Sequence, residues 1–398
     1  MLTLLLDLDD TLLETNMDAF LPAYFQALSM HLAPYVQPEV MLPALVAGTR
    51  AMMASLDPSR TLRQVFDERF YSSLGLSRDG MQAHIEEFYD EVFPHLRGVT
   101  AQRPEAVELV RWAFHQGYRV AVATDPFFPR KATLHRLRFA GLPPEDYPFA
   151  LVSSYENFHF TKSHTAYFAE FLGRLGWPDD PVLMVGNDAH RDLAPARELG
   201  LATFWVNAEA PDKSGPYSTG RGSLSDLRSW LQSVDLKGLE PQFKTRESIT
   251  ALMTAAPASI SSLMEETSPA SWASRPAPAE WALTEILCHL RDTEVEVNQP
   301  RLQRMMVEGE PFIAARVTDI WAEERRYLEQ DGRLAFHAYL EARMATLETL
   351  NGLGDSDWAR RARHSIFGPT TLREMVGFMT THDRIHIQQI WKLLHPPA

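Results

Sequence analysis

Cysteine is nearly absent from this sequence, since Cys288 is the only one in 398 residues. A single cysteine excludes an intramolecular disulfide and any zinc site built from several thiolates, and it fits a reducing compartment. Long apolar runs are also missing. No stretch approaches the 18 or more residues of a membrane span, and residues 2–6 are too short for a signal peptide. These absences predict a cytoplasmic protein without a membrane segment.

The chain also lacks an excess of positive charge. It has 52 acidic and 38 basic residues, which gives a formal net charge of −14. This charge repels polyanions and argues against binding of nucleic acids or anionic membranes. Small ligands are therefore the expected partners. The length exceeds the usual size of one domain, so we expect two domains, each with its own core.

Carboxylates gather in the first dozen residues, where the apolar run Leu4-Leu5-Leu6 opens into Asp7-Leu8-Asp9-Asp10-Thr11. A charge beside a buried strand costs several kcal/mol unless a metal or partner compensates it. Strand alternation places Asp7 and Asp9 on the same side, about 7 Å apart, which is the reach needed to share a metal or substrate. A bound divalent cation would supply the compensation. The simpler alternative is a helix start that Asp10 or Thr11 merely caps.

The segments that follow predict a parallel sheet with a helical insertion. Residues 14–96 have helical spacing and could close over the carboxylates as a lid, or form a plain helical layer. From Pro104 onward, strands and helices alternate, with apolar runs at 118–123, 149–152, 182–185 and 203–206. Such alternation favours a parallel sheet with helices on both faces. Ligands bind at the carboxyl ends of these strands, so we expect convergence of Asp7, Thr124, Lys162 and Asp188.

Beyond residue 235 the strand signal disappears. We expect a loop at 213–223, a helix at 224–231 and a linker at 235–243. Four long helical patterns then occupy residues 246–266, 281–306, 332–350 and 371–394. The sequence thus predicts an α/β domain over residues 1–234, with a helical cap at about 15–96, and an all-α four-helix bundle over residues 243–398.

The first domain resembles the haloacid dehalogenase-like (HAD) hydrolases. Four features agree in order: the Asp-Leu-Asp-Asp-Thr run, Thr124 at a strand end, Lys162, and Gly186-Asn187-Asp188 with Asp192. The resemblance implies a Rossmann-like core and a Mg²⁺-dependent hydrolase. Two details depart from the common pattern, because Asn187 stands where many relatives have Asp and Ser163 where a Pro often follows the lysine.

The resemblance also implies roles for individual residues. Asp7 would attack phosphorus to form an aspartyl phosphate, and Asp9 would protonate the leaving oxygen and then activate water. Thr124 and Lys162 would stabilise the transferring phosphoryl group. The expected Mg²⁺ ligands are the Asp7 carboxylate, the Asp9 carbonyl, and one or both of Asp188 and Asp192. Relatives that cleave carbon–halogen bonds lack the second aspartate, so Asp9 favours a small phosphate monoester as substrate.

The last helical pattern carries two histidines on its inward stripe. His382 and His386 are four residues apart and therefore share one helix face, the spacing with which a helix offers two imidazoles to one metal. For this pair alone, two hydrogen-bonded core histidines would be an equally good interpretation. A third candidate is His289, and Thr371-Leu372-Arg373-Glu374 is a capping box that supports the register of the last helix.

With these motifs, residues 243–398 resemble the DinB-like four-helix bundles. The resemblance implies that His289, His382 and His386 bind one divalent metal with open coordination positions. Zn²⁺, Ni²⁺ and Fe²⁺ all suit imidazole ligands. The whole chain is then a magnesium-dependent phosphatase fused to a metal-binding bundle. Two alternatives stay open: the bundle is the main catalyst, as a thiol-dependent transferase or metal hydrolase, or it is a binding or dimerisation module of a homodimer.

Overall fold

The computed structural model describes residues 1–206 and 217–396. The chain folds into two compact units. The first contains Met1–Phe171 and Pro178–Gln242, and the second contains Leu172–Trp177 and Phe243–Ala398. We describe each unit by itself.

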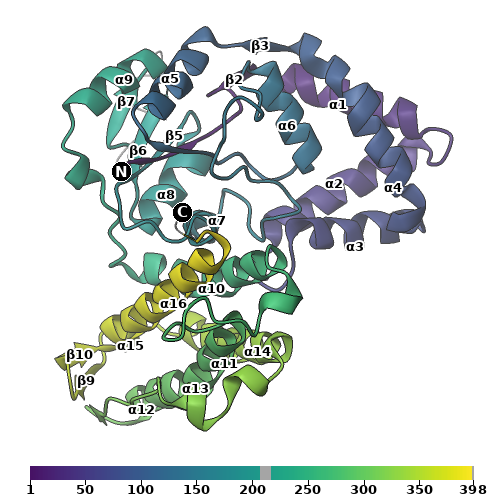
Figure 1. Ribbon diagram of the computed structural model, residues 1–398. Coiled ribbons are helices and arrows are strands. Elements are labelled where there is room, and N and C mark those ends of the chain that lie inside the picture. The colour runs from purple at the N-terminus through teal and green to yellow at the C-terminus, as the bar shows by residue number, and fades with distance from the viewer. Residues whose placement is uncertain (207–216, 397–398) are drawn as a thin grey trace. The chain divides into compact units, whose positions relative to one another are not determined.

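A five-stranded sheet forms the centre of the first unit (Figure 1). All neighbours in the order β4-β1-β5-β6-β7 are parallel. The strands are β1 (Thr3–Leu6), β4 (Arg119–Val122), β5 (Val182–Gly186), β6 (Ala202–Val206) and β7 (Gly220–Gly222). Every residue of β1, β5 and β6 is buried, because a parallel sheet is covered on both faces. The predicted parallel α/β core is confirmed.

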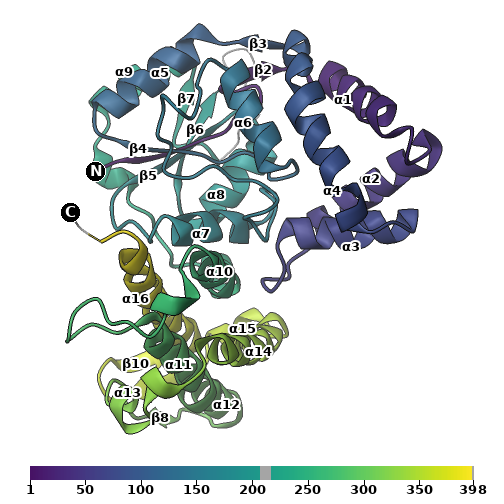
Figure 2. The same ribbon diagram turned by 45° about the vertical axis from the view of Figure 1, so that its right-hand side comes forward.

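Helices cover this sheet from both sides. Helices α5 (Pro104–His115) and α9 (Leu224–Ser233) lie to one side of the strands, and α8 (Ala194–Leu199) lies to the other (Figure 2). The remaining helical segments of the core are α6 (Arg130–Phe139), α7 (Thr165–Arg174), the π-helical turn η3 (Ala189–Leu193) and the 3₁₀ turn η5 (Leu236–Leu239). Polar loops at the carboxyl ends of β1, β4 and β5 thus meet at one edge of the sheet.

Two details of the predicted core were wrong. Residues 149–152 do not form a strand, although the Ala150 amide donates to the Val120 carbonyl at 2.8 Å. A single bridge joins Val122 and Val152, and Val152 is the one residue of this segment that is buried. The predicted loop at 213–223 contains β7, and its residues 213–216 lie outside the described part of the chain.

The predicted helical insertion is present as a cap. It consists of α1 (Met17–Leu32), α2 (Pro38–Ala54), α3 (Leu62–Leu74), α4 (Arg78–Glu87), a π-helical turn (Phe88–Val92) and a 3₁₀ turn (Phe93–Val99). Two short antiparallel strands that the sequence did not reveal, β2 (Leu13–Thr15) and β3 (Thr100–Gln102), flank this insertion. They join both ends of the cap to the core at one place.

Four long helical stretches form the second unit, as predicted. They are α10 (Arg246–Glu265), α11 (Leu283–Thr293), which continues through a π-helical turn (Glu294–Asn298) into α12 (Gln299–Val307), α14 (Gly332–Asn351), and α16 (Leu372–Leu394). The capping box at Thr371 and Glu374 starts α16 as expected. The bundle carries further elements that were not predicted: β8 (Phe312–Ile313), β9 (Arg361–His364) and β10 (Gly368–Thr371) in one small sheet, α13 (Trp321–Glu324), α15 (Asp355–Trp358), η6 (Pro269–Ser271) and η8 (Tyr327–Glu329).

None of the helices in the described ranges combines the length and the apolar character that a membrane crossing requires.

Candidate functional site

A cavity of about 190 Å³ opens at the carboxyl edge of the sheet. Most of the residues that line it are polar or charged. Its lining consists of Asp7, Asp9, Asp10, Met17, Asp125, Phe127, Phe128, Lys162, Asn187, Asp188, Arg191 and Asp192. Of the residues predicted for this site, the structure brings all but Thr124 to the wall of this one cavity. Thr124 is the neighbour of Asp125 in the chain.

Lys162 connects the strand that ends at Asp7 to the turn that contains Asp192. Its Nζ donates to Asp7 Oδ1 at 2.6 Å and lies 2.5 Å from Asp192 Oδ1, and all three side chains are buried. Burial and the charge of Asp192 raise the pKa of Asp7 to about 7, although Lys162 opposes this shift. Burial opposes the charge of Lys162, but Asp192 and Asp7 together hold the pKa of Lys162 above its usual value. One buried cation therefore neutralises two carboxylates only in part.

Asp9 and Asp10 have different environments although they are adjacent. Asp9 forms an ion pair with Arg136 of α6, which is fully buried. Asp10 has a left-handed backbone (φ 57°), and its Oδ1 accepts from the Thr15 amide at 2.8 Å. Asp and Asn adopt this conformation more readily than most residues because their side chains can bond to nearby backbone groups. Asp10 thus shapes the turn, while the Asp9 side chain remains paired at the cavity wall.

Thr124 and Asp125 follow β4. The Thr124 carbonyl accepts from Ser153 Oγ at 2.7 Å and from the Tyr167 hydroxyl at 3.0 Å. The Thr124 hydroxyl is buried, and it has no hydrogen-bond partner among the residues that the structure describes. Asp125, which the sequence reasoning did not assign, accepts from the Lys162 amide at 3.3 Å, and burial raises the pKa of Asp125 to about 6. Its position directly after Thr124 at a strand end was the available signal.

Asp192 lies in η3, which follows β5, and Asp188 caps the start of η3. Asp188 Oδ1 accepts from the amides of His190 and Arg191, so this side chain caps the turn and is partly exposed. Asp192 Oδ2 accepts from the Asp188 amide at 2.9 Å. The Arg191 guanidinium lies 3.6 Å from Asp188 and 3.7 Å from Asp125. The turn therefore presents the carboxylates of Asp188 and Asp192 and the guanidinium of Arg191. Sequence reasoning did not assign Arg191.

The composition of this wall suits a hard cation. Six aspartates line the cavity, against the cations Lys162 and Arg191. Carboxylate and carbonyl oxygens are the ligands that Mg²⁺ prefers. Burial, more than any other cause, raises the pKa of Asp7 to about 7 and the pKa of Asp125 to about 6, and a bound cation would favour the charged form of both. Within the described residues, these carboxylates do not come together as tightly as the histidines of the second unit do.

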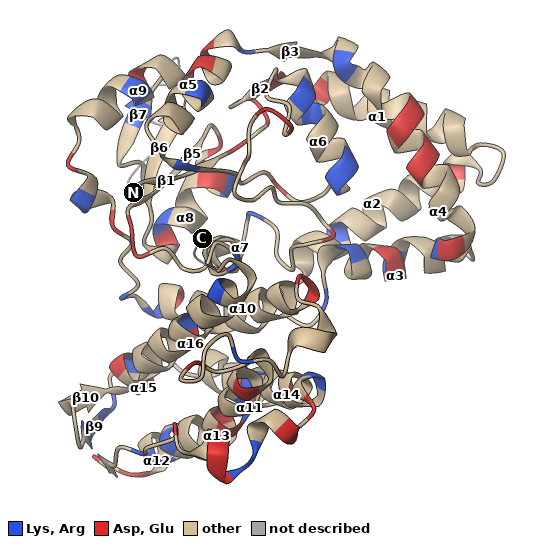
Figure 3. Ribbon diagram, viewed as in Figure 1, with Lys and Arg blue, Asp and Glu red and all other residues tan. Residues whose placement is uncertain are grey.

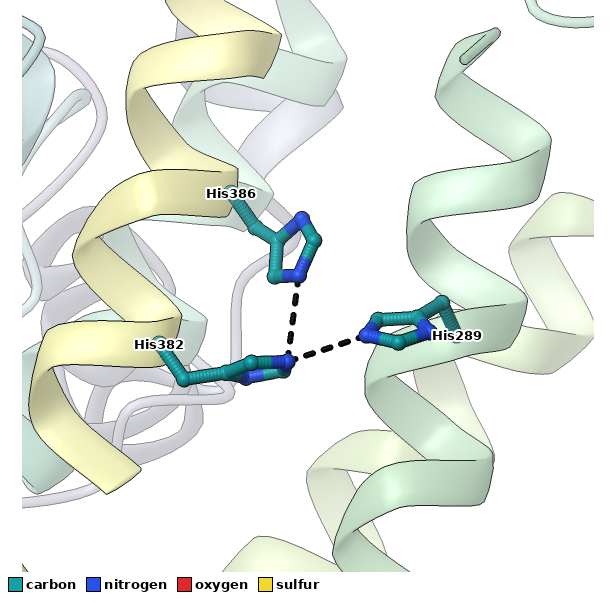
Figure 4. A group of neighbouring side chains, drawn as sticks. All are labelled: His289, His382 and His386. Atoms are coloured by element: carbon teal, nitrogen blue, oxygen red, sulfur yellow. Dashed lines mark hydrogen bonds between the residues drawn. The ribbon is translucent and has the colours of Figure 1, made fainter. Parts of the chain in front are cut away.

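Three histidines converge in the second unit, one from α11 and two from α16 (Figure 4). His289 Nε2 lies 2.9 Å from His382 Nε2, and His386 Nε2 lies 3.1 Å from the same atom. His289 and His386 are buried, while His382 is partly exposed. The predicted set His289, His382 and His386 is thus brought to one point, with one side toward solvent.

Mutual hydrogen bonds cannot satisfy all three imidazoles, because His382 Nε2 has either one proton or one lone pair and lies beside two other Nε2 atoms. A metal with N–metal distances of 2.0–2.1 Å and tetrahedral angles would place its ligand nitrogens about 3.3 Å apart, slightly more than the observed separations. Gln389 Oε1 lies 2.8 Å from His386 Nδ1. It can accept the Nδ1 proton, which leaves the Nε2 lone pair toward the shared point. Within the described chain, the buried Nδ1 atoms of His289 and His382 lack hydrogen-bond partners.

A buried ion network positions α16 beside these histidines. Arg343 Nη1 donates to Asp383 Oδ2 at 2.6 Å, and Arg343 Nη2 donates to Glu294 Oε2 at 2.9 Å. Glu294 also accepts from Thr346 at 2.6 Å. Asp383 directly follows His382, so the network fixes the rotation of the helix that carries two of the three imidazoles.

Burial keeps the imidazoles neutral. It lowers the pKa of His289 to about 3 and the pKa of His386 to about 4, with the neighbouring His386 adding to the shift at His289. Neutral imidazole is the form that binds metals. The cluster is therefore ready for a metal at pH 7 without having to lose protons.

Two protein-family models match the chain. The model described as haloacid dehalogenase-like hydrolase matches residues 1–200. The model of the DinB superfamily matches residues 252–390. Both resemblances predicted from the motifs are confirmed. No curated protein matches the chain in sequence.

Several solved structures are similar to parts of the chain. A 2-haloacid dehalogenase from Pseudomonas syringae pv. Tomato DC3000 is 24% identical over 58% of this chain and 97% of its own, with a TM-score of 0.41. A HAD phosphatase from Thermococcus onnurineus is 21% identical over 61% and 100%, with a TM-score of 0.39. YfiT from Bacillus subtilis, described as "a probable metal-dependent hydrolase with an unusual four-helix bundle topology", is 18% identical over 38% and 87%, with a TM-score of 0.35.

The lowered pKa values predict how the metal-free protein responds to acid. In the unfolded chain both histidines titrate near 6.5, so below that pH the unfolded state binds protons that folded His289 and His386 exclude. The contribution of these two histidines to the free energy of unfolding is therefore fully present above about pH 6.5, and it decreases as the pH falls below that value. We expect the denaturant midpoint of chelator-treated protein to drop from pH 7 to pH 5, by an amount equivalent to several kcal/mol.

The matched comparison uses His289→Gln with His386→Gln against His337→Gln, a change at an exposed histidine of α14. In the double variant the denaturant midpoint should fall much less between pH 7 and pH 5, while the control variant should show the same fall as the parent protein. Equal pH dependence in all three proteins would contradict the assigned burial of the cluster.

Proposed function

Because the chain belongs to the haloacid dehalogenase-like hydrolases, we propose that it hydrolyses phosphate monoesters at the site around Asp7. The observation that supports this most is the contact of the buried Asp7 carboxylate with Lys162 at the carboxyl edge of the sheet. In the proposed reaction, Asp7 attacks phosphorus, its oxygen forms a new bond to phosphorus, and the ester bond to the alcohol breaks. Water then hydrolyses the aspartyl phosphate and regenerates Asp7.

Asp9 acts as the general acid in the first step and as the general base in the second. It gives a proton to the departing alkoxide and later takes one from the attacking water, the division of labour expected when one of two neighbouring carboxylates is the nucleophile. Its ion pair with the buried Arg136 holds the carboxylate at the cavity wall, beside the proposed nucleophile.

Lys162 and Thr124 stabilise the phosphoryl group. Lys162 is held by Asp7 and Asp192 and so places a fixed positive charge beside the attacked atom. The Thr124 hydroxyl, which lacks a partner among the described residues, is a donor that a phosphoryl oxygen would satisfy. Asp7, the Asp9 carbonyl, Asp188 and Asp192 are the residues that would hold Mg²⁺. When bound, the ion neutralises negative charge on the phosphoryl oxygens.

The carboxylate of Asp9 supports one of two chemistries that we considered for this site. A dehalogenase needs no proton donor for a leaving halide, whereas a phosphatase needs one for an alkoxide. Asp9 lines the cavity within the same turn as the nucleophile. This observation favours phosphate esters over carbon–halogen bonds as the substrate.

Replacement of Asp7 by Asn tests the nucleophile. We expect kcat on p-nitrophenyl phosphate to fall by at least about 10³-fold, because the amide keeps the shape but cannot form the covalent intermediate. The matched control is Asp18→Asn, an exposed aspartate in the first turn of α1 that does not line the cavity. Hydrolysis that survives in Asp7→Asn, in a preparation free of other phosphatases, would refute the assignment.

Removal of divalent metal tests the role of the acidic wall. Chelation with EDTA should abolish turnover, and added Mg²⁺ should restore it, because the six aspartates of the wall outnumber the cations that pair with them, Lys162, Arg136 and Arg191. Ca²⁺ serves as the comparison ion, since it has the same charge but a larger and less regular coordination shell. Full activity in EDTA would show that the protein supplies all the charge compensation itself.

For the second unit we propose a metal centre ligated by His289, His382 and His386. Three protein ligands leave at least one position for water or substrate, which is the arrangement of catalytic zinc sites. Zn²⁺, Ni²⁺ and Fe²⁺ remain the candidate ions. If the centre serves a thiol-dependent transferase, the thiol comes from a co-substrate, because burial raises the pKa of Cys288 to about 11.

Metal content tests this centre. The intact protein should bind one equivalent of transition metal per chain after reconstitution and dialysis, measured by elemental analysis. The His382→Ala, His386→Ala double variant should retain less than a tenth of this amount, because one imidazole alone is a weak ligand set. The control is His337→Ala with His395→Ala, two exposed histidines outside the cluster. Equal metal content in all three proteins, or no metal in the parent protein, would show that these histidines do not form a metal centre and have a structural role.

A further inference from the structure

A second and larger cavity, of about 460 Å³, lies in the first unit. We call it the cap cavity, because most of its wall comes from the cap helices α1 to α4. Its cap residues include Met17, Tyr24, Val46, Thr49, Asp67 and Tyr89. Residues of the core complete it: Phe127, Phe128, Pro129, Tyr155 and Arg191.

The cap cavity adjoins the site around Asp7. Met17, Phe127, Phe128 and Arg191 line both cavities. A phosphate held beside Asp7 is therefore separated from the cap cavity only by walls that the two spaces share. The group attached to that phosphate has the cap cavity as its nearest large space.

The wall of the cap cavity is suited to hydrocarbon. Helix α2, which contributes five lining residues, has only Glu39 and Arg50 as charged residues and is tan over most of its length in Figure 3. Aliphatic side chains and aromatic rings make up most of the other surfaces. A pocket of this composition and size is typical of sites that bury an apolar ligand.

Several polar groups of this wall already have a hydrogen-bond or ion-pair partner within the protein. The hydroxyls of Tyr24 and Tyr89 lie 2.9 Å apart, and Thr49 donates to the Leu45 carbonyl at 3.0 Å. Asp67 pairs with Arg78 at 3.1 Å. A sugar or nucleotide would lose its hydrogen bonds to water in this cavity and could not replace them with bonds to these groups. The unsatisfied polar groups of such a ligand would lower its affinity. The wall thus selects against the polar alcohols of most small phosphate esters.

We propose that the substrate is an amphiphilic phosphate monoester, with its phosphate beside Asp7 and a hydrocarbon-rich alcohol in the cap cavity. This inference rests on the proposed phosphatase function and adds the substrate class. The reaction balances as a hydrolysis: the ester P–O bond breaks, the alcohol leaves with the proton that Asp9 gives, and water provides the oxygen that stays on phosphate. The apolar tail also excludes water from the Phe127 and Phe128 side of the site.

The test is a series of n-alkyl phosphates from ethyl to decyl, with glycerol phosphate and glucose 6-phosphate as polar comparisons. All esters are used below their critical micelle concentrations, and kcat/KM is measured on the intact protein. We expect kcat/KM to rise by about fourfold per methylene, the factor that corresponds to burial of one CH₂ group, and to level off when the cavity is full. Both polar esters should be poorer substrates than octyl phosphate.

Two exposed valines of α2 provide a matched pair of variants. Val46 lines the cap cavity and is 40% exposed, whereas Val40 is 50% exposed and does not line it. Val46→Trp should lower the octyl-to-ethyl ratio of kcat/KM by at least about tenfold, because the indole occupies space that the tail needs. Val40→Trp should leave the ratio unchanged.

The outcomes separate this inference from the function on which it rests. Hydrolysis of all alkyl phosphates at one rate, a preference for the polar esters, or equal effects of both tryptophans would overturn the amphiphilic substrate and leave the phosphatase standing. If no phosphate ester of any length is hydrolysed, the phosphatase proposal fails and the substrate class falls with it.

Discussion

The contact of Lys162 with Asp7 and Asp192 is the interaction on which the first unit depends. It joins three segments far apart in the sequence: the end of β1, the loop before α7 and the turn after β5. Removal of one partner from a buried ion pair typically costs about 3–5 kcal/mol, because the other charge stays behind without compensation. The same interaction leaves Asp7 short of compensation, which is why burial still raises its pKa to about 7. The interaction that stabilises the first unit thus also leaves Asp7 only partly neutralised.

The second unit also contains a buried cation between two carboxylates, and here the cation is an arginine. Arg343 is fully buried between Glu294 and Asp383, and it contacts carboxylate oxygens of both. Here too one cation faces two carboxylates, and the neighbouring imidazoles are kept neutral by burial. The guanidinium can bond to both carboxylates at once because it presents several donors in one plane. The network therefore holds the histidine cluster in place without taking part in it.

The sequence predicted the elements and the sites whose signals are local. Alternating apolar runs identified the strands that end at Asp7 and Thr124, and helical spacing identified the face that carries His382 and His386. It did not predict Arg136 or Arg191, because a basic residue in a helix or turn has no local sign of the distant carboxylate that it meets. The short sheet of the bundle was missed for a different reason, because strands of two to four residues have too little periodicity to be recognised.

Arg136 shows how the two cavities of the first unit are connected physically. Its guanidinium pairs with Asp9 and lies over the ring of Phe128, 5.1 Å from the ring centroid. Phe128 in turn lines both the site around Asp7 and the cap cavity. A cation over an aromatic face gains more from this contact when water is absent. Arg136 is itself fully buried, so this contact already lies in surroundings without water. The side chain that pairs with Asp9 therefore packs against a ring that forms part of both cavity walls.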